Sequence, residues 1–105
     1  MIYHTILSQD LKRIINDPDI FLLDVRTPEE YEIVNLGGKL IPDYELQNIL
    51  HELPLDKTIV VICHHGVRSG RVVNFLIEKG YNKVKNLVGG IDRYAQEADT
   101  SLRRY

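Results

Sequence analysis

Two long apolar runs dominate the pattern of the chain. Residues 20–25 are apolar apart from Asp24, and residues 59–62 contain no polar side chain. Runs without alternation are typical of strands that are covered on both faces of a parallel sheet. Shorter segments at residues 39–41 and 84–88 predict two further strands.

Apolar residues at helical spacing separate these strands. The expected caps, which can bond the free N–H groups of a first helical turn, are Ser8, Thr27, Asp43 and Ser69. Proline or glycine stop signals follow at residues 17–18, 37–38, 54 and 80, and a last helix is expected over residues 91–98. Strands that alternate with helices predict an α/β fold. Its central, mainly parallel sheet would be flanked by helices on both faces and linked by right-handed crossovers.

Length and composition fit one folded domain over residues 1–105. Of the 105 residues, 44% are hydrophobic and 27% are charged, values that suit a packed core rather than a disordered chain. The polar segment at residues 99–105 is expected to be a loosely held tail.

Charge and hydropathy exclude several function classes. A net charge of -2 leaves no electrostatic footprint for nucleic acid. No apolar run approaches the roughly 20 residues of a membrane-spanning helix, and residues 1–5 do not resemble a signal peptide. The only cysteine, Cys63, excludes an internal disulfide. A free cysteine without a secretion signal fits a reducing, cytoplasmic setting.

Cys63 occupies a position where parallel sheets carry their sites. It directly follows the strand expected at residues 59–62 and faces the helix expected from Ser69. The carboxyl ends of parallel strands hold ligands, and a helix N-terminus favours negative charge. The segment from Cys63 to Arg71 contains two arginines, two histidines, two glycines and no acid.

This setting predicts that Cys63 is a nucleophile. Gly66 permits a turn that directs the loop N–H groups inward as a nest for an anion, and the guanidinium of Arg68 can face that anion. Such a loop favours the thiolate, which is the reactive form. The alternative is that Cys63 is a small buried residue that merely closes a strand.

Loop length separates two kinds of chemistry. Cysteine phosphatases and arsenate reductases of related design place five residues between cysteine and arginine, which cradles a tetrahedral oxyanion. Here four residues lie between Cys63 and Arg68, and Ser69 stands where the phosphatase arginine would be. A tighter loop fits a smaller group, such as an added sulfur atom.

Three motifs in this order resemble a single-domain rhodanese, a sulfurtransferase. They are Leu-Asp-Val-Arg-Thr-Pro-Glu-Glu-Tyr at residues 23–31, Cys-His-His-Gly-Val-Arg-Ser at 63–69 and Leu-Val-Gly-Gly-Ile at 87–91. Residues 35–42 and the ending Arg-Arg-Tyr look most like rhodanese domains attached to adenylating enzymes. Those enzymes resemble ubiquitin activators and serve molybdopterin, thiamine or thiolated-tRNA synthesis.

The resemblance implies a two-step transfer without a metal or organic cofactor. Cys63 takes a sulfane sulfur from thiosulfate or a persulfide, and a nucleophilic acceptor removes it. Cyanide in an assay, a thiol or an activated sulfur-carrier protein could act as acceptor, and an adenylating enzyme is a further expected partner. The substrate-binding N–H groups are expected from His64, His65, Gly66, Val67 and Arg68.

Four further residues are assigned supporting roles. Asp24 and Arg26 stand at a strand end, but we expect Asp24 to bond nearby backbone and Arg26 to pair with Glu29 or Glu30. Ser69 belongs to the helix start. Arg71 either extends a positive rim or is a solvated helix residue.

The two histidines depart from the family pattern, because many members carry arginine one or two residues after the cysteine. With histidine there, the loop is expected to carry less fixed charge at neutral pH, and more below the ordinary pKa of histidine near 6.5. A metal site with Cys63 is not expected, since adjacent residues rarely converge on one ion. Two other functions stay open: a cysteine-based phosphatase or arsenate reductase, and an interaction module in which Cys63 is unreactive.

Overall fold

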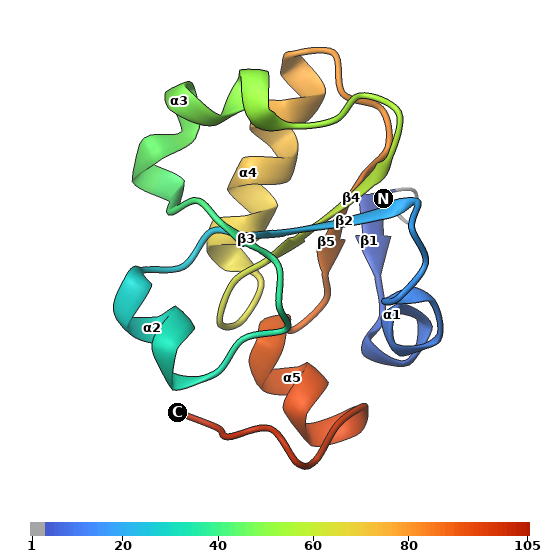
Figure 1. Cartoon of the computed structure of the whole chain (residues 1–105), viewed down its shortest axis with the longest axis vertical. Helices are drawn as coiled ribbons and strands as arrows, with labels where there is room; N and C mark the ends of the chain where they lie inside the picture. Colours follow the sequence, from blue (N-terminus) through green and yellow to red (C-terminus); the bar gives the residue numbers. More distant parts are fainter. Residues whose placement is uncertain (1–3) are drawn as a thin grey trace.

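The computed structural model describes residues 4–105, which form a five-stranded sheet with helices on both faces (Figure 1). The strand order is β1-β5-β4-β2-β3, and every neighbouring pair is parallel. This confirms the predicted α/β fold with a parallel central sheet. The strands are β1 (Thr5–Ile6), β2 (Ile20–Asp24), β3 (Lys39–Leu40), β4 (Thr58–Ile62) and β5 (Val84–Leu87).

The central strand β4 explains the apolar run at residues 59–62. Ile59 and Val61 belong to the apolar cluster on one face of the sheet. Val60 and Ile62 belong to the cluster on the opposite face. All four side chains are buried, so the strand needs apolar residues at every position and shows no alternation.

The helices cover these two clusters. α4 supplies Val72 and Leu76 to the first cluster, while α1 and α5 supply Leu11 and Ile91 to the second. The helices are α1 (Ser8–Ile14), α2 (Pro28–Ile33), α3 (Leu46–Ile49), α4 (Val67–Glu78) and α5 (Gly90–Glu97). Within residues 4–105, no helix has both the length and the apolar character needed to cross a membrane.

The start of α2 matches its prediction in detail. The hydroxyl of Thr27 accepts the backbone N–H of Glu30, and the Glu30 carboxylate accepts the N–H of Thr27. This reciprocal capping box satisfies donors that the first helical turn leaves free, and Pro28 occupies the first helical position.

Three expected caps are wrong. Ser8 is the first residue of α1, because the extended backbone of Leu7 takes the cap position. Pro42, not Asp43, takes the cap position of the next segment, which is a 3-10 turn at Asp43–Glu45. Glu45, with φ -109° and ψ 17°, separates this turn from α3, and a second 3-10 turn follows at Leu50–Glu52.

The third correction concerns α4, which begins at Val67 rather than after Ser69. Gly66 precedes it with φ 101°, a left-handed conformation that glycine adopts without the steric cost of a Cβ atom. Ser69 therefore lies inside the first turn, where it is fully buried.

Two elements near the chain ends differ from the prediction as well. The two-residue strand β1, which pairs with β5, is too short to leave a periodic signal. Gly90, expected in a turn, is the first residue of α5.

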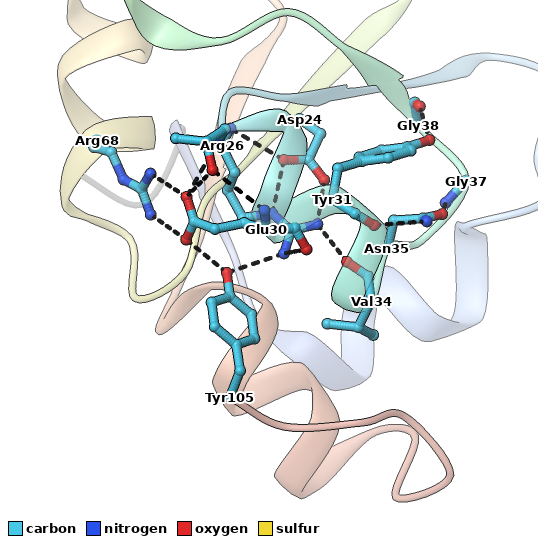
Figure 2. Close-up of polar contacts among 11 residues, drawn as sticks. Asp24, Arg26, Glu30, Tyr31, Val34, Asn35, Gly37, Gly38, Arg68 and Tyr105 are labelled. Atoms are coloured by element: carbon cyan, nitrogen blue, oxygen red, sulfur yellow. Dashed lines mark hydrogen bonds and ion pairs between the residues drawn. The ribbon is translucent and has the colours of Figure 1, made fainter.

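The tail returns to the molecule after α5. Leu102 packs against the apolar cluster beneath α1 and α5, and Arg104 pairs with Asp92. The last residue, Tyr105, reaches Arg26 and Glu30 (Figure 2). The loose attachment of this segment in solution stays a prediction.

Candidate active site

Cys63 lies between the end of β4 and the start of α4, with its side chain buried. Its Sγ accepts the backbone N–H of Gly66 at 3.1 Å and that of Ser69 at 3.3 Å. The Ser69 Oγ lies 3.1 Å from the same sulfur. N–H groups aimed at one atom at a helix N-terminus stabilise negative charge on that atom.

The start of α5 holds the cysteine loop through backbone hydrogen bonds. The N–H groups of Ile91 and Asp92 donate to the carbonyls of Cys63 and His64, at 2.9 and 3.1 Å. A Cβ atom on Gly90 would lie only 2.3 Å from the His64 carbonyl oxygen. The loop and helix can approach this closely because residue 90 has no side chain.

Asn86 is a site residue that sequence reasoning missed. Its Nδ2 donates to the carbonyl of Gly66 at 3.0 Å, and its Oδ1 accepts the hydroxyl of Ser69 at 2.5 Å. Asn86 stands beside Val61 in the register of β5 and β4. The sequence carried one signal for this role, because Asn86 is a polar residue inside a strand that lies next to the central strand.

Arg68 lies at the mouth of the loop but is turned to α2. Its two terminal nitrogens donate to Glu30 Oε1 and Oε2 at 2.7 and 2.9 Å (Figure 2). The hydrogen bonds from Arg68 hold the pKa of Glu30 well below its usual value, and those to Glu30 raise the pKa of Arg68. The guanidinium expected to face an anion is thus paired with a carboxylate in this structure.

The expected pairing of Arg26 with Glu29 or Glu30 is wrong. Arg26 Nε and Nη2 donate to the two carboxylate oxygens of Asp24 at 2.9 and 2.7 Å, and both side chains are buried. A buried guanidinium needs an acceptor for each donor. The remaining acceptors are the carbonyls of Glu30 and Val34 and the hydroxyl of Tyr105.

Asp24 also accepts the backbone N–H of Arg26 at 3.2 Å, which agrees with the expected bond to nearby backbone. The pair anchors the segment between β2 and α2 (Figure 2), and the structure gives neither side chain a hydrogen bond to Cys63.

The two loop histidines and Tyr105 form a stack. The ring of His64 lies 3.8 Å from that of His65 and 3.9 Å from that of Tyr105. The Nε2 of His64 lies 3.0 Å from the main-chain oxygen of Tyr105. Burial, together with the neighbouring His65, lowers the pKa of His64.

Arg71 belongs to α4 and is exposed. It lines a cavity of about 380 Å³ between β1 and α4, whose other walls include Val67, Gly70 and Asn86. Val67 itself is largely exposed at the start of α4. Within the described residues, no three histidine, cysteine or acidic side chains gather in a way that could hold a metal ion.

Comparisons with known proteins agree with this geometry. The family model for a rhodanese-like domain matches residues 7–97. A protein from Allochromatium vinosum named sulfurtransferase is 35% identical over 92 residues, which cover 81% of this chain and 80% of that protein. The thiosulfate sulfurtransferase GlpE of Coxiella burnetii is 28% identical over 102 residues, covering 96% and 95% of the two chains.

A solved structure extends the likeness to the fold. The crystal structure of a rhodanese-related protein from Thermoplasma volcanium is similar to this chain with a TM-score of 0.82 and 36% sequence identity. The match covers 91% of this chain and 94% of that one. With the family model spanning the cysteine loop and the sheet around it, this chain belongs to the rhodanese-like domain family.

Proposed function

We propose that this protein is a sulfurtransferase that carries a sulfane sulfur on Cys63. The observation that carries the proposal is the convergence of the backbone N–H groups of Gly66 and Ser69 on Cys63 Sγ. The names of the two sulfurtransferase relatives support the same reaction class.

The transfer takes place in two displacements at sulfur. The Cys63 thiolate attacks the outer sulfur of thiosulfate, the S–S bond of the donor breaks, and sulfite leaves with the bonding electron pair. A persulfide donor reacts in the same way and leaves as a thiolate. A nucleophilic acceptor then attacks the terminal sulfur of the Cys63 persulfide, and Cys63 leaves as a thiolate. The cycle needs no outside oxidant or reductant.

Loop residues would hold the terminal sulfur between these steps. The loop is short, because only four residues separate Cys63 from Arg68. The N–H groups of the substrate-binding segment therefore fit around a single negative sulfur atom better than around a bulky group. This segment consists of His64, His65, Gly66, Val67 and Arg68. Asp24, Arg26 and Ser69 support its shape from neighbouring elements, and Arg71 extends a positive rim.

Thiosulfate or a persulfide is the proposed donor. A thiol or an activated sulfur-carrier protein is the proposed acceptor, and an adenylating enzyme of the ubiquitin-activator type is a further candidate partner. The setting we propose is the reducing cytoplasm, where Cys63 would stay free to react.

An enzyme assay separates this proposal from its alternatives. The wild-type protein, supplied with thiosulfate and cyanide, should form thiocyanate, and Cys63→Ser should not. The two proteins are also offered an aryl phosphate. Phosphate release that depends on Cys63, without thiocyanate from any sulfur donor, would favour a cysteine phosphatase and overturn the proposal.

A further inference from the structure

Asn86 joins two points of the cysteine loop through one side chain. Its Nδ2 donates to the Gly66 carbonyl and its Oδ1 accepts from Ser69. A carbonyl oxygen can only accept, so the amide nitrogen has to face Gly66. The carbonyl end of the amide must therefore face Ser69, and the orientation of Asn86 follows from its partners.

The same logic fixes the direction of the Ser69 hydroxyl. A hydroxyl has one proton to donate, and Asn86 Oδ1 can only accept it. Toward Cys63 Sγ, 3.1 Å away, the Ser69 oxygen can then only accept. The neutral Cys63 thiol thus donates its S–H to Ser69, which donates in turn to Asn86.

Ionisation of Cys63 breaks this chain of hydrogen bonds. Once the thiol proton has left for solvent, the Ser69 oxygen presents a lone pair to a negative sulfur. Either the hydroxyl turns to the thiolate and gives up Asn86, or it stays with Asn86. In the second case, the sulfur keeps only the N–H groups of Gly66 and Ser69.

We propose that Asn86 is a positioning residue that acts on Cys63 through Ser69. It competes with the thiolate for the Ser69 hydroxyl proton, and so makes the Cys63 thiol harder to ionise while it holds Gly66 in place. The inference rests on the proposed function only in taking Cys63 as the reacting residue. In the sheet, Asn86 of β5 stands beside Val61 of the central strand.

Other charged groups surround Cys63 from several elements, and they have to stay constant in a test. They are His64 and His65 in the loop, Arg68 on α4, Glu30 on α2, Asp92 on α5 and the pair of Asp24 and Arg26 at the end of β2. Among the described residues, no hydrogen bond joins any of these side chains to Asn86 or Ser69. Changes at Asn86 should therefore leave their contacts in place.

The test measures the rate of Cys63 alkylation by iodoacetamide against pH, because only the thiolate reacts. Asn86→Ala frees the Ser69 hydroxyl for the sulfur and should lower the pH midpoint of alkylation by roughly 0.5 to 1 unit. Ser69→Ala removes the hydroxyl and provides the background in which the same change at Asn86 is repeated. In the Ser69→Ala protein, the further change Asn86→Ala should shift the midpoint much less, since the hydroxyl through which Asn86 acts is gone.

Asn74→Ala, on the exposed side of α4, is the matched control and should leave the midpoint unchanged. Asn86→Asp serves as a second variant if Asn86→Ala does not fold. Its carboxylate binds the hydroxyl more strongly and adds a like charge, so the midpoint should rise, and rise less in the Ser69→Ala protein.

Equal shifts in the presence and absence of the Ser69 hydroxyl would overturn the proposal, as would an unchanged midpoint in a folded Asn86→Ala protein. Alkylation needs no sulfur donor, so a protein that failed to transfer sulfur would still give a clear answer about Asn86.

Discussion

Glu30 binds both terminal nitrogens of Arg68, across 38 positions of sequence. The same carboxylate closes the capping box at the start of α2 and accepts the hydroxyl of Tyr105 at 2.8 Å. One acidic side chain therefore joins α2, the mouth of the cysteine loop and the tail (Figure 2).

Replacing this carboxylate should make the free energy of unfolding less dependent on pH in the acidic range. We expect Glu30→Gln to lower the free energy of unfolding by about 1 to 2 kcal/mol near neutral pH. The pKa of Glu30 is lower in the folded protein than its ordinary 4.5. The contribution of the carboxylate is therefore complete above that value and is lost as the pH falls below it.

Urea unfolding at about pH 7 and about pH 3 checks this expectation. Glu29→Gln is the matched control, because Glu29 is the exposed neighbour on the same turn. A difference between wild type and Glu30→Gln that stayed the same at both pH values would contradict the assignment.

Gly90→Ala should damage the site more than the fold. The new Cβ would lie 2.6 Å from the Cys63 carbonyl oxygen and closer still to that of His64, so the loop has to move. We expect sulfur transfer to fall roughly 10- to 100-fold. The measurement is kcat/KM with thiosulfate, on protein whose folding is verified by circular dichroism.

Gly80→Ala is the matched control for backbone strain. Both glycines have a left-handed φ, 66° at Gly90 and 97° at Gly80. A Cβ atom on Gly80 would meet nothing within 4 Å. It should cost about 1 to 2 kcal/mol of stability and leave the activity of the folded protein unchanged. A similar loss of activity in both variants would argue against contact between Gly90 and the loop as the cause.

Removing the buried cation should be the most destabilising of these changes. Arg26→Met leaves the carboxylate of Asp24 buried without its partner, and we expect a loss of about 3 to 5 kcal/mol. Arg13→Met breaks the exposed pair with Asp10 and should change stability by less than about 1 kcal/mol. Thermal and urea unfolding of the two variants measure these losses of stability. Equal losses of stability in both variants would refute a special role for the buried pair.

Tyr105→Ala should raise the pKa of His64 toward its ordinary value. Burial is the main cause of the lowered pKa, and the Tyr105 ring covers one face of the His64 ring. An NMR titration of the histidine ring protons measures the change, with Arg103→Ala as an exposed control in the same tail. An unchanged His64 titration would mean that Tyr105 leaves the ring in solution.

The architecture was predictable because it depends on local patterns. The unbroken run at residues 59–62 reports burial on both faces, and the Thr27 to Glu30 spacing reports a capping box. Spacing also located Cys63 at a strand end. These signals lie within one element or turn, so a single sequence can carry them.

The missed contacts depend on the tertiary arrangement instead. Asn86 reaches Ser69 and Gly66 across 17 and 20 positions, and Tyr105 reaches Glu30 across 75. Strand register and helix packing decide such partners. Arg26 was assigned to the wrong acid for another reason: its partner Asp24 is only two residues away, but the sequence does not show that both side chains are buried.

Intact-mass measurement after incubation with thiosulfate tests the central claim most directly. The protein should gain the mass of one sulfur atom, lose it again on treatment with a reductant or cyanide, and gain none as Cys63→Ser. If Cys63 takes up no sulfur from thiosulfate or from any persulfide donor, the assignment of this protein as a sulfurtransferase is contradicted.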